Sequence, residues 1–537
     1  MPLSVSSAVH RPGVPAVWTP PAALRRDCGL ADYLEWLDVV EQRSFADYRS
    51  LWEWSISDLD AFWKSIDRFE GLGLGKDGGP ALLDTDMPGT RWFPGAKINY
   101  AEHAFRRAPG LDVAALICVS EGSESTISWG ELRRQVGALA AHLRDAGVGK
   151  GDRVVGYLPN TEVPVVGLLA CASLGAVWSV CSPEFGHLAV LRRFAQLRPK
   201  VLIAAARAED LAEIVAGLDT LEQVVYVDDD EPPRTPLRHM SWAEASAGHH
   251  PIRFVDVEFD HPLWVQFSSD TTEMPRGIVH GHGGIVLEHL KLLRLHSDLR
   301  AEDRLLFPCS TSQTVWNLQV GGLLIGATLV LVDGSLAGAD LGRIWQIADR
   351  HRVAILGVGA AYIDNCRNDE QRPGQDADFG ALRSIIVTGS SLGPDGFCWV
   401  RENVGPGVWL ASISGGTDVC SAFVGGVPLL TVRSGRMQAP ALGVAVAAWD
   451  EEGRPVVGQP GELVVSKPMP SMPLYFWGDA EGARYLDSYF RMFPGVWRHG
   501  DVIEFDADGT SVMHGRSDAA TGELDALRPP SSSTARP

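Results

Sequence analysis

The sequence predicts an α/β protein with two mixed or parallel sheets sandwiched by helices, followed by a small β subdomain. Three observations support this prediction. Between residues 111 and 439, apolar runs alternate with amphipathic stretches, which is typical of parallel strands joined by crossover helices. Before residue 111 the chain is rich in tryptophan and has helical spacing. After residue 439 the pattern changes to short strands separated by turns.

These changes divide the chain into five parts. We expect a disordered N-terminus over 1–27, a Trp-rich helical cap over 28–110, an α/β core over 111–439, a small β subdomain over 440–518, and a low-complexity disordered tail over 519–537. Within the cap, Ser57 and Asp60 form a Ser-x-x-Asp capping pattern. The apolar residues behind it recur at helical spacing: Leu59, Phe62, Trp63 and Ile66.

Composition limits the partners and the location. The 537 residues carry 47 Lys and Arg against 67 Asp and Glu, a net charge of −20, which repels nucleic acid and anionic membrane surfaces. The eight cysteines are scattered without a CxxC pair, which predicts reduced thiols, a cytoplasmic protein and no zinc site. The uncharged run 163–181 approaches the length of a membrane span, but its Ala, Gly and Ser content favours a buried helix running into a strand.

A Ser/Thr-rich segment, SSDTTEMPRG at 268–277, follows an apolar strand. This arrangement is typical of a loop that holds phosphate through backbone N–H groups and needs glycine for close approach. Asp270 and Glu273 occupy the two places where glycine is expected. A carboxylate about 4 Å from a phosphate costs several kcal/mol, so the sequence predicts weakened phosphate binding. Taken alone, such a segment is more often a plain turn.

Three further motifs follow in order: SISGGTD at 412–418, WRHGDVIEF at 497–505 and HGRSD at 514–518. Each alone is explained by a turn or a surface ion pair. Together with the Ser/Thr loop they resemble the adenylate-forming superfamily of acyl-CoA synthetases, luciferases and peptide-synthetase adenylation domains. Within it, segments 92–102, 182–186, 278–291 and 470–479 are similar to the acetoacetyl-CoA synthetases. The resemblance implies ATP, Mg²⁺ and CoA as cofactors. It also implies that a small carboxylic acid, acetoacetate, is converted to an acyl-adenylate and then to a thioester.

The resemblance also implies roles for individual residues. Thr417 would contact the α-phosphate, Asp418 would hold Mg²⁺, and Asp501 and Arg516 would bind the ribose, while Gly389 lies where the family contacts adenine. The β- and γ-phosphates would meet Ser268, Ser269, Thr271, Thr272 and Arg276, the last in place of a lysine. Gly415 and Gly416 belong to the nucleotide-binding motif and, with Ser414, replace bulky residues. This opens an acyl pocket lined by Ser414, Trp316 and Asn317.

Two departures from the family pattern affect the predicted activity. Ser312, Gln313, Thr314 and Val315 are smaller and more polar than the hydrophobic run expected beside the acyl group, so the acid could differ from acetoacetate. In the family, a hinge at the position of Asp518 leads into a lid that carries a catalytic lysine; 19 residues follow Asp518 here, none of them lysine. The sequence therefore predicts impaired ligase activity, or a lid supplied by a separate lid-bearing or full-length ligase. The alternatives are a catalytically inactive paralogue with a binding or regulatory role, or another reaction on a preformed adenylate.

Overall fold

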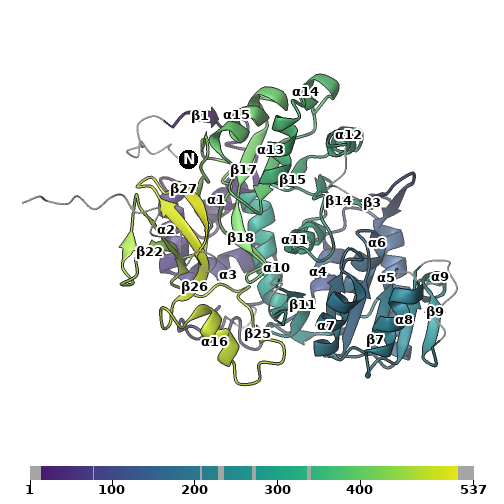
Figure 1. Ribbon diagram of the computed structural model, residues 1–537. Helices are drawn as coiled ribbons and strands as arrows, with labels where there is room; N and C mark the ends of the chain where they lie inside the picture. Colours follow the sequence, from purple (N-terminus) through teal and green to yellow (C-terminus); the bar gives the residue numbers. More distant parts are fainter. Residues whose placement is uncertain are drawn as a thin grey trace, which may run out of the picture.

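The computed structural model describes residues 14–75, 78–205, 208–227, 235–268, 274–334 and 340–517 (Figure 1). Two large sheets form its centre, with helices between them and on both outer faces. This arrangement confirms the predicted α/β class. No helix in these described ranges is both long and apolar enough to cross a membrane.

The first sheet has eight strands in the order β25-β12-β11-β6-β5-β7-β8-β9. From β11 to β9 neighbouring strands are parallel, whereas β11, β12 and β25 pair antiparallel. The hairpin that joins β11 to β12 contains the Ser/Thr-rich segment. The strands are β5 (Arg153–Tyr157), β6 (Val177–Cys181), β7 (Val201–Ala204), β8 (Gln223–Tyr226), β9 (Arg238–Ser241), β11 (Pro262–Phe267), β12 (Gly277–Gly281) and β25 (Tyr475–Phe476).

The second sheet has seven strands in the order β17-β16-β15-β13-β14-β3-β4. All neighbours are parallel except β3 and β4, which form an antiparallel pair. The strands are β3 (Ala114–Val119), β4 (Glu124–Ser128), β13 (Arg304–Leu306), β14 (Thr328–Val332), β15 (Ile355–Gly359), β16 (Ser384–Thr388) and β17 (Trp409–Ser412).

The layer between the sheets is mainly apolar, and it also buries polar and charged side chains such as Glu288, His289 and Lys291. Helix α6 (Glu162–Leu174) is buried from residue 163 to residue 174 and leads into β6, which confirms the buried helix and strand predicted for the uncharged run. Its neighbours are α4 (Tyr100–Arg106), α5 (Trp129–Asp145), α10 (His282–Leu290), the π-helix η1 (Lys291–His296) and α11 (Thr314–Gly321), with the short η2 (Gly322–Leu324).

Helices also cover the outer face of each sheet. Apolar side chains of α7 (His187–Leu197) and α8 (Ala208–Ala216) pack on the first sheet, and those of α12 (Gly342–Arg350), α13 (Ala360–Asn368) and α15 (Pro394–Asn403) pack on the second. Two short helices complete the core, α9 (Trp242–Ala245) and α14 (Pro373–Asp376).

The N-terminal cap contains α1 (Gly29–Val39), α2 (Tyr48–Ser57) and α3 (Leu59–Glu70). All four apolar residues predicted at helical spacing in α3 are buried. The capping prediction was wrong by one residue, because Ser57 ends α2 and the side chain of Asp58 accepts the N–H of Ala61. Strand β2 (Lys97–Ile98) pairs with β10 (Val257–Glu258) and joins the cap region to the core.

Residues 14–27, expected to be disordered, instead include β1 (Ala16–Trp18), which pairs with β20 (Val432–Arg433). Trp18 stacks on Trp409, and its indole Nε1 donates to the Gly407 carbonyl at 3.3 Å. These long-range contacts offset the entropy of ordering this part of the N-terminus. Residues 1–13 lie outside the described ranges.

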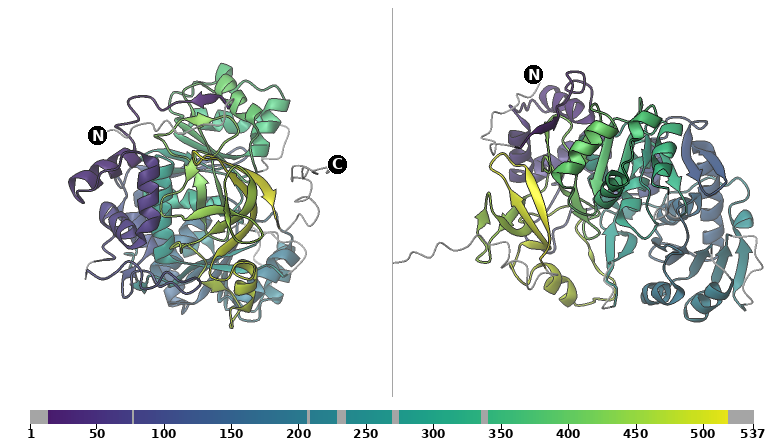
Figure 2. Two further views of the ribbon diagram at one scale, coloured as in Figure 1. Left: turned by 90° about the vertical axis from the view of Figure 1, so that its left-hand side faces the viewer. Right: turned by 45° about the horizontal axis from the view of Figure 1, so that its top comes forward.

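The β subdomain is an antiparallel sheet in the order β23-β22-β24-β26-β27. Helix α2 packs beside it (Figure 2): the Tyr48 hydroxyl donates to the Pro440 carbonyl at 2.6 Å and the Trp52 indole to the Val444 carbonyl at 3.1 Å. The elements are β22 (Val446–Trp449), β23 (Pro455–Val456), β24 (Pro460–Val465), α16 (Ala483–Tyr489), β26 (Trp497–Phe505) and β27 (Ser511–Arg516). A three-stranded sheet of β18 (Ser414–Gly416), β19 (Ser421–Gly425) and β21 (Ala439–Pro440) links it to the core.

Candidate functional site

The Ser/Thr-rich segment begins where β11 ends and closes where β12 begins. Ser268 and Arg276 face each other across this hairpin: the Ser268 N–H donates to the Arg276 carbonyl at 3.1 Å, and the Arg276 N–H donates to Ser268 Oγ at 3.1 Å. Their mutual bonds fix the two ends of the loop. Five residues between them lie outside the described ranges: Ser269, Asp270, Thr271, Thr272 and Glu273. The sequence assigns the serine and the threonines to phosphate binding, and the two acidic residues to its disruption.

Thr417 and Asp418 lie in the turn between β18 and β19. Thr417 Oγ1 accepts a hydrogen bond from Thr314 Oγ1 at 2.7 Å. The hydroxyl of Tyr489 donates to Asp418 Oδ1, and the ring of Tyr489 stacks on Trp497 with centroids 3.6 Å apart. The Asp418 carboxylate is therefore oriented by an aromatic residue that is itself fixed by packing.

Asp501 and Arg516 face each other across the antiparallel pair β26 and β27. Arg516 Nη1 lies 3.5 Å from Asp501 Oδ1, and His499 Nε2 lies 3.5 Å from Asp501 Oδ2. Gly416 connects this pair to the preceding motif, since a β-carbon at Gly416 would lie 3.1 Å from His499 Nε2. A glycine therefore lets the two motifs approach each other closely.

Each of the four predicted motifs contributes at least one residue to one cavity of about 200 Å³, whereas Gly389 and the residues predicted for the acyl pocket do not line it. Arg276, Asp418 and Arg516 line it, as the sequence predicts. So do five residues that were not predicted: Asp487, Ser488, Tyr489, Arg498 and His499. Arg276 Nη1 donates to Ser488 Oγ at 3.2 Å across this space. Three guanidinium groups against two carboxylates make the cavity suited to an anion.

Gly389 directly follows β16, with φ at +88° and nothing within 4 Å of a built β-carbon. The Ser391 hydroxyl in the same loop donates to the Met513 carbonyl of β27 at 2.6 Å. This bond places the loop beside the strand that carries Arg516. The predicted contact of Gly389 with adenine stays a prediction.

The residues predicted for the acyl pocket have different surroundings. Trp316 is fully buried, and its indole donates to Asn160 Oδ1 at 3.1 Å, while Asn317 is also buried. Gly415 is required structurally, because a β-carbon there would lie 1.9 Å from the Ser421 carbonyl oxygen. Of the polar residues predicted beside the acyl group, Thr314 reaches the turn through Thr417. Ser414 lies in β18, directly before these two glycines.

Sequence reasoning did not predict Tyr489, His280 or His499 as site residues. Burial raises the pKa of Tyr489 and lowers that of His280 to about 4, so that both side chains are neutral. The only available signal for His280 was its place in the segment 278–291, which carries three histidines. Tyr489 had none, because its contact with Asp418 joins residues far apart in the chain.

The donor set suits Mg²⁺. Asp418 contributes a hard carboxylate oxygen beside an arginine-lined cavity, and Mg²⁺ in proteins is commonly held by one or two carboxylates with substrate phosphates and water. Lys291 does not line this cavity. It lies in the interlayer core, where its Nζ is 2.7 Å from Glu288 Oε2. The predicted hinge residue Asp518 lies outside the described ranges. The side chain before it is fixed: Ser517 Oγ donates to Glu462 Oε1 at 3.0 Å and accepts from Arg498 Nη2 at 2.8 Å.

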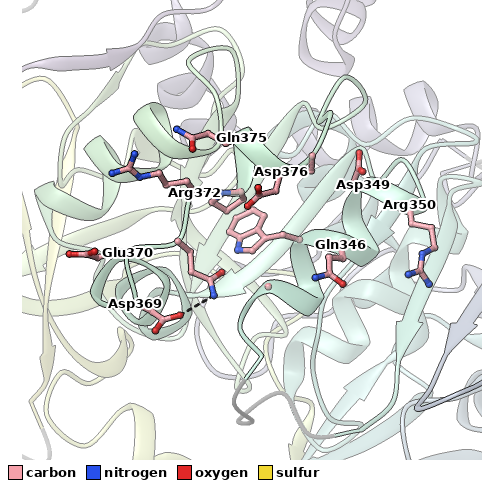
Figure 3. Close-up of a pocket in the computed structure, with 13 residues that line it drawn as sticks. Gln346, Asp349, Arg350, Asp369, Glu370, Arg372, Gln375 and Asp376 are labelled. Carbon is pink, nitrogen blue, oxygen red and sulfur yellow. Dashed lines mark hydrogen bonds between the residues drawn. The ribbon is translucent and has the colours of Figure 1, made fainter.

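A larger cavity, of about 690 Å³, lies away from this site beside α12 and α14 (Figure 3). Side chains of both charges line it, and Gln371 Nε2 donates to Asp369 Oδ2 at 3.1 Å within it. None of the residues predicted for nucleotide or acyl binding lines this cavity. The labelled lining residues are Gln346, Asp349, Arg350, Asp369, Glu370, Arg372, Gln375 and Asp376.

Comparison with known families agrees with this geometry. A family model described as AMP-binding enzyme matches residues 101–476, and one described as the N-terminus of acetyl-coenzyme A synthetase matches residues 48–104. The fold and the site thus define an AMP-binding enzyme of the acyl-CoA ligase class.

Individual relatives narrow the class. Acetoacetyl-coenzyme A synthetase of Rhizobium meliloti is 40% identical over 94% of this chain and 79% of its own length. Acetoacetyl-CoA synthetase of Mus musculus is 37% identical over 93% of this chain and 76% of its own length. The solved structure of the Streptomyces lividans acetoacetyl-CoA synthetase is 42% identical, with a TM-score of 0.89, over 94% of this chain and 80% of that one. The chain belongs to the acetoacetyl-CoA synthetase family.

Proposed function

We propose that this chain binds MgATP and a short carboxylic acid, joins them as an acyl-adenylate, and transfers the acyl group to the thiol of CoA. The observation that carries the proposal is the meeting of Arg276, Asp418 and Arg516 around one cavity, with Asp501 opposite Arg516. Positioning and neutralisation of phosphate charge account for most of the catalysis in such a first step.

Each side chain has a role in this proposal. Arg276 and Arg516 would offset the negative charge of the phosphates, and Thr417 would contact the α-phosphate. The Asp501 carboxylate would accept hydrogen bonds from the ribose hydroxyls, while Arg516 and His499 hold it from either side. Asp418, oriented by Tyr489, would hold Mg²⁺, which when bound neutralises and orients phosphate oxygens.

Acetoacetate is the proposed acid. Ser414 carries a small side chain where the resemblance expects a bulky one, which favours an acid longer than acetate. Gly415 adds no such space, because a β-carbon there would lie 1.9 Å from the Ser421 carbonyl oxygen. The relatives in Rhizobium meliloti and Streptomyces lividans carry the name acetoacetyl-CoA synthetase. The hydroxyl of Thr314 beside Thr417 favours an acid that carries a second polar group.

We further propose that ATP binds weakly and that the first step is slow. By the family resemblance, Asp270 and Glu273 belong to the segment that would contact the β- and γ-phosphates, where each would bring a negative charge toward a polyanion. The same two residues favour a second candidate function, a binding or regulatory protein that retains an AMP or acyl site without ligase turnover. AMP lacks the two outer phosphates, so its binding tests the rest of the site separately from the loop.

Calorimetric titration with MgATP and with AMP separates these possibilities. We expect Asp270→Gly/Glu273→Gly to tighten MgATP binding at least tenfold, roughly the effect of removing 1.4 kcal/mol of repulsion, and to leave AMP affinity unchanged. Asp219→Asn/Glu222→Gln removes the same charge from an exposed surface and controls for net charge. Release of pyrophosphate and thioester formation with acetoacetate and CoA should rise in the loop variant.

The outcomes distinguish each part of the proposal. The second function is supported if the wild-type chain binds AMP and neither the wild type nor Asp270→Gly/Glu273→Gly forms a thioester. Failure of every variant to bind AMP contradicts the nucleotide site itself. Tight MgATP binding and steady thioester formation by the wild-type chain contradict the proposed weakening.

A further inference from the structure

The turn that carries Thr417 and Asp418 contains a strained residue. Cys420 has φ at +44°, in the left-handed region that residues other than glycine seldom adopt. Its N–H donates to the Gly416 carbonyl at 2.9 Å and closes the turn between β18 and β19. Such a conformation persists only where the surrounding structure holds it.

Two histidines hold the carbonyl groups of this turn. His280, at the end of β12, donates from Nε2 to the Asp418 carbonyl at 2.9 Å. His289, in α10, donates from Nε2 to the Cys420 carbonyl at 3.0 Å. Both rings are fully buried, and Figure 1 shows β18 beside α10 at the centre of the molecule.

The surroundings of both rings determine which nitrogen carries the proton. The Trp264 indole donates to His280 Nδ1 at 3.1 Å, so the single proton of a neutral ring lies on Nε2, the atom that faces Asp418. The Nε2 of His289 faces a carbonyl, which can only accept, so it also carries the proton. Gln266 adds a weaker contact from Nε2 to Cys420 Sγ at 3.7 Å.

We propose that His280 and His289 are positioning residues that hold the Asp418–Cys420 turn in its strained conformation and thereby present Thr417 and Asp418 to the nucleotide. This inference rests on the proposed nucleotide site. Neither ring needs to touch the substrate, because each acts through a backbone carbonyl of the turn. Removing one donor would let Cys420 relax toward negative φ and move Asp418 away from the cavity.

Both rings also fill the core: the His289 ring lies 6.1 Å from that of Trp264, and a β-carbon at Gly321 would lie 2.4 Å from His289 Nδ1. A test must therefore separate the donated hydrogen bond from the volume of the ring. His289→Phe keeps an aromatic ring without a donor, whereas His289→Gln keeps an N–H donor at a similar reach. Cys420→Gly supplies a residue that adopts φ near +44° without strain.

The experiment measures AMP affinity by calorimetry in the full chain with Mg²⁺ present, for each variant alone and for His289→Phe/Cys420→Gly. We expect His289→Phe to weaken AMP binding about tenfold and His289→Gln less than threefold, as the loss or retention of one hydrogen bond implies. In the Cys420→Gly background, the loss of AMP affinity caused by His289→Phe should be at least threefold smaller than in the wild type. This loss is obtained by comparing the double variant with Cys420→Gly alone. A role in packing alone predicts no such rescue.

Hydrogen–deuterium exchange of peptides covering 414–425 gives a readout that does not depend on nucleotide. Exchange of these peptides should rise in His289→Phe and stay near wild type in His289→Gln. Exchange of the remaining peptides shows whether a variant that binds no AMP is still folded elsewhere. Wild-type exchange and wild-type AMP affinity in a folded His289→Phe overturn the inference, as does the absence of rescue by Cys420→Gly. A wild-type chain that binds no AMP contradicts the proposed function instead, and the exchange data then decide the positioning role.

Discussion

Gly415 shows how one residue controls the geometry of the site. A β-carbon there would lie 1.9 Å from the Ser421 carbonyl oxygen, a backbone atom that cannot rotate away. We expect Gly415→Ala to separate β18 from β19 and to lower the free energy of unfolding by about 1–3 kcal/mol, the usual cost of overpacking. Urea unfolding measures this change. Gly149→Ala, where nothing lies within 4 Å of the new β-carbon, serves as control; equal stability of the two variants would contradict the argument.

At the same scale, the sequence predicted the residues that lie within contiguous motifs. Asp501 and Arg516 were expected at one site, and the register of β26 and β27 brings them together. Tyr489 and His280 could not be predicted, since a tyrosine or histidine in an apolar stretch is more often part of a core. Their contacts with Asp418 depend on the way that α16 and β12 pack around the turn.

At the scale of elements, α10 and η1 bury an ion pair between the two sheets. Glu288 Oε2 lies 2.7 Å from Lys291 Nζ and accepts from Ser421 Oγ at 2.8 Å, and both charged side chains are fully buried. We expect Lys291→Met to lower the free energy of unfolding by roughly 3–5 kcal/mol, because it leaves the buried Glu288 carboxyl without its cation.

The double variant Glu288→Gln/Lys291→Met removes both charges and should recover most of that loss, because replacing a buried pair by uncharged groups is often nearly neutral. Denaturant unfolding of the wild type, both single variants and the double variant gives the coupling energy. Additive effects of the two substitutions would show that the pair contributes no interaction of its own.

The elements were predicted best where local pattern and burial agree. The uncharged run became α6 and β6 because both lie wholly inside the core. Ser57 was predicted to cap α3, yet the neighbouring aspartate serves that purpose, because α2 extends to Ser57 and leaves no gap before Asp58. Strand β1 was missed, since its partner β20 lies more than four hundred residues further along the chain.

At the scale of the whole molecule, buried histidines make stability depend on pH. Burial lowers the pKa of His280 and His289 to about 4 and that of His296 to about 3, and it lowers the pKa of His282 well below its ordinary value. His296 links the core to the β subdomain region: its Nδ1 donates to the Gly426 carbonyl at 2.8 Å, and its Nε2 accepts the Leu442 N–H at 3.1 Å. All four rings are neutral in the folded chain at neutral pH.

An unfolded histidine takes up its proton near pH 6.5, whereas these folded rings do so only at much lower pH, so the unfolded chain binds more protons between those values. Stability is therefore fully present above pH 6.5 and is lost as the pH falls toward 4. Each buried histidine should lower the free energy of unfolding by about 1 kcal/mol between pH 7.5 and pH 5.5. Denaturant unfolding across this range measures the slope of the free energy of unfolding against pH.

His296→Gln should reduce this slope by the equivalent of one proton, while the exposed control His239→Gln should leave the slope unchanged. Stability that stays constant from pH 7.5 to pH 5.5 would show that these rings are hydrated or already protonated in the folded protein.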